Sequence, residues 1–184
     1  MEFRLLTEEE KTVYKNQLID MLILSDNEFV PPLSKRSSTT QADLSATEKS
    51  CGGVSFYFAE MSKQNILCAF MEEEILGFVS FRENYISDVI SEDELPNIYV
   101  STLILSPKAR GRGLSTEMYS YLFDTLYPES AVFTRTWSTN TAHTKILSKF
   151  GFSEMLRKHN ERGEGIDTVY YKKEKSRVHI ESAV

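Results

Sequence analysis

The residues with the clearest potential for chemistry lie at positions 98–115. An apolar run rich in β-branched residues occupies 98–105 and stops before Pro107. A short basic segment with two glycines follows, made of Lys108, Arg110, Gly111, Arg112 and Gly113. A helical pattern opens at Leu114, so the order of elements is strand, tight turn and helix start.

This order of elements predicts an anion-binding site made largely of backbone. The first N–H groups of a helix have no partner within the helix, and the helix dipole places partial positive charge at the same end. The three cationic side chains of the turn strengthen that field. We therefore expect a ligand that carries phosphate.

Two common phosphate-binding motifs do not fit this turn. A P-loop requires a lysine and a hydroxyl residue after the last glycine of a longer loop, whereas Leu114 follows Gly113. A dinucleotide-binding fingerprint requires a third glycine and an acidic residue about 20 positions later, and the spacing here does not supply them. The turn therefore calls for a different phosphate-bearing ligand.

Two sequence blocks resemble those of the GNAT-type N-acetyltransferases. The motif Arg110-x-x-Gly113-x-Ser115 is similar to the family's Gln/Arg-x-x-Gly-x-Gly/Ala signature, which grips the pyrophosphate of acetyl-coenzyme A (acetyl-CoA). One strand later comes a block similar to the family's second-helix pattern Asn-x-x-Ala-x-x-Leu-Tyr-x-Lys-x-Gly-Phe. It reads Asn140-x-x-His143-x-x-Ile146-Leu147-x-Lys149-x-Gly151-Phe152. The resemblance is sharp over 98–152.

Three positions depart from the family pattern. Ser115 stands where glycine or alanine is usual, and it is still small enough for a close approach of pyrophosphate. His143 replaces a small residue. Leu147 stands where many members have a tyrosine that protonates the departing thiolate, so that role has no counterpart at this position.

The resemblance implies how acetyl-CoA is held. The backbone N–H groups of the turn bind pyrophosphate oxygens, with the side chains of Arg110 and Arg112 helping; the turn residues are Arg110, Gly111, Arg112, Gly113, Leu114 and Ser115. A backbone N–H near the end of the preceding strand, at Leu103, Ile104 or Leu105, stabilises the thioester oxygen. Asn140 and His143 contact the pantetheine arm or the acetyl end, although Asn140 also fits a plain helix N-cap.

Acetyl transfer to an amine also requires proton transfers. Glu83, at the end of a predicted strand, is the first candidate for the base, with Glu94 and Asp93 as alternatives. Tyr119 is a candidate acid in place of the absent tyrosine, as are Tyr170 and Tyr171. His143 is a further acid–base candidate because imidazole titrates near neutral pH, although a surface histidine would have the same sequence signature.

Composition limits the class of protein. The chain has 184 residues, which suits one domain over 1–184, with 175–184 as a trailing tail. A net charge of −6 argues against nucleic-acid binding. Acidic residues near the N-terminus and the lack of a long apolar run predict a cytoplasmic protein without membrane contact. Two cysteines and three scattered histidines give no metal-site spacing, so we expect free thiols and no metal.

The predicted elements form an α/β domain of the GNAT-like type, with a mixed, mostly antiparallel central sheet flanked by helices. Helical patterns cover 7–24, 114–126 and 142–150, and a helix is favoured over a strand at 54–64. Between them, 33–53 reads as a loop and 84–97 as an acidic connection. Strands are predicted at 3–6, 66–71, 75–82, 98–105, 132–137, 152–157 and 168–172.

The resemblance implies an N-acetyltransferase that moves an acetyl group from acetyl-CoA to a primary amine by direct attack in a ternary complex. The acceptor is a small molecule or a peptide, shaped by residues 20–60 and 84–97, and the acidic 84–97 segment favours a cationic one. A homodimer is compatible with this. The alternative is a non-catalytic acyl-CoA sensor or interaction module.

Overall fold

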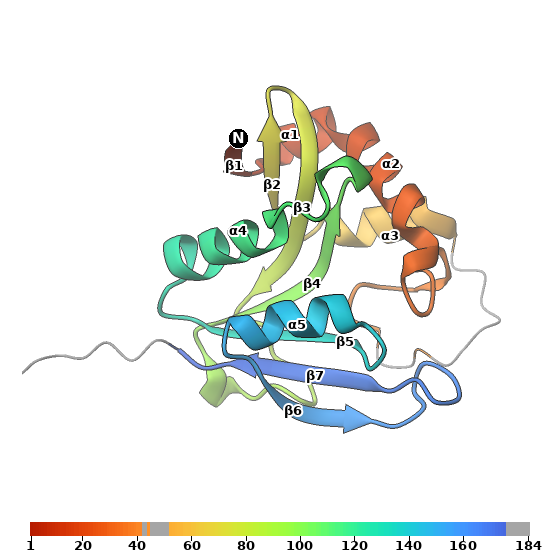
Figure 1. Ribbon diagram of the computed structural model, residues 1–184, viewed down its shortest axis with the longest axis vertical. Coiled ribbons are helices and arrows are strands. Elements are labelled where there is room, and N and C mark those ends of the chain that lie inside the picture. Colours follow the sequence, from red (N-terminus) through yellow and green to blue (C-terminus); the bar gives the residue numbers. More distant parts are fainter. Residues whose placement is uncertain (42–43, 45–51, 176–184) are drawn as a thin grey trace, which may run out of the picture.

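A computed structural model describes residues 1–41, 44 and 52–175. Its centre is a seven-stranded sheet in the order β1-β2-β3-β4-β5-β7-β6 (Figure 1). Every neighbouring pair is antiparallel except β4 and β5, which are parallel. The strands are β1 Glu2–Leu5, β2 Asn65–Met71, β3 Glu74–Glu83, β4 Asn97–Leu105, β5 Ala131–Trp137, β6 Ser153–Lys158 and β7 Thr168–Lys173.

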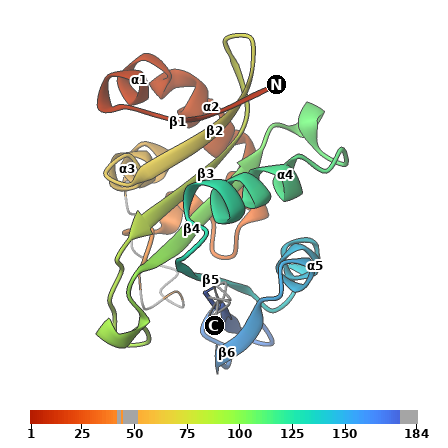
Figure 2. The ribbon, with the colours of Figure 1, turned by 90° about the vertical axis from the view of Figure 1, so that its left-hand side faces the viewer.

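Helices cover both faces of this sheet. Helices α1 (Glu8–Val13), α2 (Lys15–Ser25) and α3 (Gly53–Met61) lie on one face (Figures 1 and 2). Helix α4 (Leu114–Ser120), which continues as a π-helical segment over Tyr121–Leu126, lies on the other face together with α5 (Thr141–Lys149). The predicted fold class is therefore confirmed.

Local sequence explains where the first elements begin and end. Thr7 and Glu10 form a reciprocal capping box that starts α1. The helix predicted over 7–24 is broken in the structure, because Tyr14 leaves the helical conformation between α1 and α2 (φ −90°, ψ 6°). The predicted β2–β3 hairpin forms, and Glu72 adopts a left-handed conformation in its turn.

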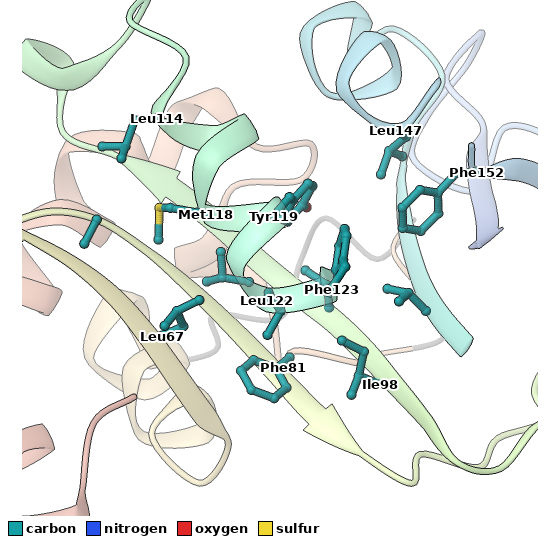
Figure 3. Close-up of a cluster of buried hydrophobic side chains, with 14 of the residues drawn as sticks. Leu67, Phe81, Ile98, Leu114, Met118, Tyr119, Leu122, Phe123, Leu147 and Phe152 are labelled. Atoms are coloured by element: carbon teal, nitrogen blue, oxygen red, sulfur yellow. The ribbon is translucent and has the colours of Figure 1, made fainter. Parts of the chain in front are cut away.

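Each face of the sheet buries its own apolar cluster. One cluster packs α4 and α5 against the strands, and Figure 3 shows Tyr119, Phe123, Leu147 and Phe152 among its side chains. The other packs α2 and α3 against the opposite face and includes Cys68, whose thiol pKa is raised by burial. Cys51, the other cysteine, lies outside the described residues, as does the 176–184 part of the predicted tail.

The sheet opens between its two parallel strands. β4 pairs with β5 only from Asn97 to Val100, opposite Ala131 to Thr134. Beyond that point β4 continues to Leu105 and β5 to Trp137 without pairing to each other. The two strands therefore diverge in the middle of the molecule (Figure 1), and β4 forms no ladder with β5 beyond Val100.

Across 1–41, 44 and 52–175, no helix is both long and apolar enough to cross a bilayer. Over the same ranges, no group of three or more histidine, cysteine, aspartate or glutamate side chains is arranged to hold a metal ion.

Candidate active site

The glycine-bearing turn presents a row of backbone amides. A short 3₁₀ turn, Pro107–Ala109, leads out of β4, and Gly113 is the N-cap residue of α4. With the other described residues, the N–H groups of 111–115 form no hydrogen bond of good geometry. Such groups at a helix start bind anions readily. The turn is thus built as the sequence predicts for a pyrophosphate cradle.

Two glycines are required for the shape of this turn. Gly111 and Gly113 have φ values of 73° and 84°, which other residues adopt at a cost of roughly 1–2 kcal/mol. A Cβ atom at either position would meet no other atom within 4 Å, so the backbone conformation, and not crowding within the protein, selects glycine.

The three cations of the turn differ in their partners. Arg110 forms an ion pair with Glu28 (2.8 Å) and donates to the carbonyl of Leu105 (3.1 Å). Lys108 is paired with Glu74. Arg112 is exposed, and with the described residues its side chain forms no ion pair or hydrogen bond. Of the three, Arg112 has its charge most available to a ligand.

The divergence of the strands leaves the predicted oxyanion donors accessible. β4 carries a bulge at Ser101, because Ser80 pairs with Thr102 while the adjacent Phe81 pairs with Val100. After this bulge, Leu103, Ile104 and Leu105 pair with β3 on one side only. In an antiparallel ladder alternate residues point their N–H groups to opposite sides, so some of these amides face the gap.

A cavity of about 310 Å³ occupies the gap between β4 and β5. From the α4–α5 face it is lined by Ser115, Tyr119, Asn140, Ala142, His143 and Ile146. From the other face it is lined by Ser25, Glu28, Phe29, Arg36 and Thr39. Leu103, Ile104, Leu105 and Arg110 also border it, so most of the predicted cofactor residues meet in one space.

Tyr119 and His143 form a hydrogen-bonded pair in this cavity. The Tyr119 hydroxyl lies 2.8 Å from Nε2 of His143, and the tyrosine side chain is fully buried. Loss of hydration lowers the pKa of His143 to about 4, so its imidazole is neutral at pH 7. Burial raises the pKa of Tyr119, so its hydroxyl stays protonated. The sequence places these residues 24 positions apart and gives no sign of their contact.

Asn140 and Leu147 have clear structural roles. The Asn140 side chain caps α5 by accepting from the backbone N–H of His143 (3.2 Å), and it donates to Thr136 (3.0 Å). It still borders the cavity, so its contact with a pantetheine arm stays a prediction. Leu147, at the position of the family's tyrosine, is completely buried in the core.

The carboxylates proposed as base are not brought to the cavity. Glu83 ends β3 opposite Ile98, and its carboxylate accepts hydrogen bonds from Asn65 and Tyr127 (both 2.7 Å). Glu94 is paired with Lys172 at 2.9 Å, and Asp93 is exposed. None of the three borders the cavity, and neither does any other residue of 84–97. Glu28 is the sole carboxylate that borders it among the described residues.

Of the alternative proton donors, Tyr170 hydrogen-bonds to Arg135 and Tyr171 lies on β7 away from the cavity lining. Trp137, at the end of β5, also borders the cavity. The same wall contains residues that sequence reasoning missed: Arg36, Thr39, Arg135 and Arg162. The one local signal for Arg135 is that it places a charge inside the otherwise apolar strand predicted over 132–137.

A glycine turn with unpaired amides lies beside two strands that diverge over a cavity, and this cavity is bordered from both faces of the sheet. The family model for the GNAT acetyltransferase family matches residues 33–152. The chain therefore belongs to the GNAT acetyltransferase family, and this assignment supports acetyl transfer in general terms.

Solved structures with similar folds agree with this assignment. One is a GNAT-family acetyltransferase from Desulfovibrio desulfuricans (12% identity, TM-score 0.63, covering 94% of this chain and 98% of that one). Another is an N-acetyltransferase from Staphylococcus aureus (14% identity, TM-score 0.62, covering 94% of this chain and 97% of that one). A third is YncA from Salmonella typhimurium, solved with its cofactor acetyl-CoA (14% identity, TM-score 0.58, covering 100% of this chain and 99% of that one). A search of curated proteins finds no match.

Proposed function

We propose that this protein is an N-acetyltransferase that moves an acetyl group from acetyl-CoA to a primary amine by direct attack in a ternary complex. The observation that carries this proposal is the cavity between β4 and β5, which is bordered from both faces of the sheet. A donor held on the α4–α5 face and an acceptor on the opposite face can meet there without a covalent enzyme intermediate.

The residues of the turn fit the diphosphate of acetyl-CoA. The unpaired N–H groups of 111–115 supply several donors in a row, and Arg112 supplies a cation without a partner among the described residues. Hydrogen bonds to a charged group contribute about 1.5–3 kcal/mol each. The bound cofactor supplies a thioester as the source of the acetyl group.

The backbone of β4 is proposed to hold the thioester and stabilise its transition state. An N–H of Leu103, Ile104 or Leu105 that faces the gap would stabilise the negative charge that develops on the thioester oxygen. A donor of this kind typically contributes about 100- to 1,000-fold in rate. The side chains of these three residues are partly or fully buried, so only their backbone takes part.

The Tyr119 hydroxyl, oriented by His143, is proposed to give its proton to the departing thiolate, and the proton that the attacking amine loses restores the Tyr119 hydroxyl. The raised pKa of Tyr119 keeps its hydroxyl protonated at neutral pH, and neutral His143 at 2.8 Å orients it. This arrangement takes the place of the family's tyrosine, since Leu147 belongs to the core.

The alternative, an acyl-CoA sensor without catalysis, gives a different result in one experiment. Acetyl-CoA is titrated calorimetrically into the protein, and thiol release is then followed with a panel of amines. Binding together with amine-dependent thiol release supports the transferase. Binding without release from any amine favours the sensor, and absence of binding contradicts both.

A further inference from the structure

Three arginines from distant parts of the chain border the acceptor side of the cavity. Arg36 follows the 3₁₀ turn Leu33–Lys35, Arg135 lies on β5, and Arg162 lies in the β6–β7 connection. Arg36 and Arg162 are only 6% and 7% exposed, and Arg135 is half-buried. Lysine and arginine are rarely buried to this degree without a partner of opposite charge.

Hydrogen bonds show that the guanidinium groups of Arg36 and Arg162 lie close together. The carbonyl oxygen of Val30 accepts from both Arg36 (3.4 Å) and Arg162, which places these two groups on one acceptor atom. Arg36 also donates to the carbonyl of Pro31 (3.0 Å), and Arg162 to the hydroxyl of Thr168 (2.9 Å). These acceptors orient the arginines but carry no net charge.

Aromatic rings complete the wall and hold the arginines in place. Arg36 lies over Phe29 and Arg162 over Trp137, with guanidinium carbons 5.3 and 5.7 Å from the ring centroids. The rings of Phe29 and Trp137 are themselves in contact, 5.6 Å apart. A rigid wall of this kind is organised before a ligand arrives.

The three guanidinium groups form no ion pair with the described residues, and Glu161 exerts its attractive charge on Arg135 and Arg162 without contacting them. No carboxylate oxygen of 1–41, 44 or 52–175 lies within ion-pair distance of the three guanidinium groups. Glu161 is the nearest acidic influence, and its ion pair is with Lys158 (3.6 Å). Glu28, the carboxylate on the cavity wall, is engaged by Arg110.

Burial and electrostatic repulsion between the arginines lower the pKa values of two of them, Arg36 and Arg162. Burial, which is the largest cause, and the neighbouring charges of Arg36 and Arg135 together lower the pKa of Arg162 to about 9. Burial and Arg135 also lower the pKa of Arg36. Placing like charges together in a dry site costs free energy, and a bound anion would remove most of that cost.

We infer that the acceptor is a small amine that also carries an anionic group, a carboxylate or a phosphate, and that Arg36, Arg135 and Arg162 bind this group. The inference rests on the proposed function, since it names the substrate class of that site. A cavity of about 310 Å³ suits a small molecule. Guanidinium groups match both anions in geometry. This replaces the cationic acceptor expected from the acidic 84–97 segment, which does not border the cavity.

The test compares acceptors that differ only in charge. Initial rates are measured for α-amino acids against their amides, for phosphoethanolamine against ethanolamine, and for a diamine. We expect at least about tenfold higher kcat/KM for the anionic member of one pair. The pair that shows the preference identifies carboxylate or phosphate as the anion. Equal rates within both pairs, or a preference for the diamine, would overturn the inference.

Arginine variants test the assignment to these side chains. Arg135→Gln should reduce the ratio of kcat/KM between the anionic and neutral members of the preferred pair to about threefold or less, mainly by raising KM for the anionic acceptor. Arg157→Gln is the matched control, because Arg157 is paired with Glu154 and Asp167 outside the cavity, and it should keep the ratio. An unchanged ratio in Arg135→Gln would contradict the assignment. The comparison of acceptors in the unmodified protein stands even if a variant folds poorly.

A binding measurement separates this inference from the proposed function. Inorganic phosphate is titrated into protein saturated with coenzyme A, which occupies the glycine turn. Phosphate binding that Arg135→Gln weakens supports the arginine site even if no amine is acetylated. Absence of phosphate binding, together with equal rates on neutral and anionic amines, shows that the acceptor inference fails while acetyl transfer holds.

Discussion

The hydroxyl of Tyr119 and Nε2 of His143 lie 2.8 Å apart and connect α4 with α5 at the edge of the cavity. Both groups are neutral at pH 7, because burial raises the pKa of the phenol and lowers that of the imidazole to about 4. At neutral pH the two residues therefore share one hydrogen bond without a net charge.

Replacing Tyr119 with phenylalanine tests the proposed proton donor. The ring remains to fill its place against Phe123, 4.8 Å away, so the fold should be kept. We expect kcat to fall by about 100-fold or more, the usual size of a general-acid contribution, with little change in KM for acetyl-CoA. Steady-state kinetics and circular dichroism measure the two effects.

Tyr121→Phe is the matched control for this change. Tyr121 lies two positions further along the same helical segment, packs on Phe3 with 5.2 Å between ring centroids, and does not border the cavity. Its variant should keep full activity. Equal activity of Tyr119→Phe and Tyr121→Phe would remove Tyr119 from the proposed mechanism.

His143 predicts a pH dependence of stability. Its pKa is about 4 when folded and about 6.5 when unfolded, so between these values the unfolded chain binds more protons. The free energy of unfolding should therefore decrease as pH falls from about 6.5 to 4, by up to roughly 3 kcal/mol from this residue. Above pH 6.5 His143 contributes no pH dependence.

Urea unfolding of the natural protein and of His143→Gln at several pH values measures this effect. The variant should lose less stability than the natural protein between pH 6.5 and 5. Carboxylates with lowered pKa values, such as Asp167 and Glu154, act mainly below that window. Parallel curves for the two proteins would show that His143 titrates normally in the fold.

Gly113→Ala tests the cofactor turn against a matched position. Gly113 and Gly151 have similar left-handed φ values, 84° and 75°, and neither has an atom near a new Cβ. Both alanine variants should lose about 1 kcal/mol of stability through backbone strain. Only Gly113→Ala should weaken acetyl-CoA binding, as measured by calorimetry. Equal affinities of the two variants would contradict a pyrophosphate site at this turn.

The partners of the basic residues predict different contributions to cofactor affinity. Arg112→Ala should weaken acetyl-CoA binding by about tenfold or more, because its charge is available to the ligand. Lys108→Ala should have a smaller effect, since Lys108 is paired with Glu74. Calorimetric titration of both variants with acetyl-CoA at two salt concentrations measures these affinities. A larger loss of acetyl-CoA affinity in Lys108→Ala than in Arg112→Ala would contradict the prediction.

Local sequence patterns were sufficient to predict the fold and the strand–turn–helix geometry of the glycine turn. The turn, its glycines and the strand before it occupy one continuous stretch, so spacing along the chain determines spacing in the structure. The helix predicted over 114–126 was placed correctly, although periodicity did not reveal that its second half, Tyr121–Leu126, is π-helical.

The acceptor side could not be predicted in the same way. Arg36, Arg135 and Arg162 meet only because the sheet and its connections bring three distant segments together. Glu83 was a reasonable candidate from its place at a strand end, but the register with β4 puts it opposite Ile98, before the strands diverge. Strand register depends on tertiary packing, which single-sequence patterns do not contain.

The three guanidinium groups come from segments that contribute nothing to the glycine turn. Under the proposed function, exchanging residues 36, 135 and 162 should change the preferred amine and leave the binding of acetyl-CoA unchanged. Related chains could therefore diverge in acceptor while retaining the same turn. We expect the side chains at these three positions to differ among such relatives according to the charge of the acceptor that each relative modifies.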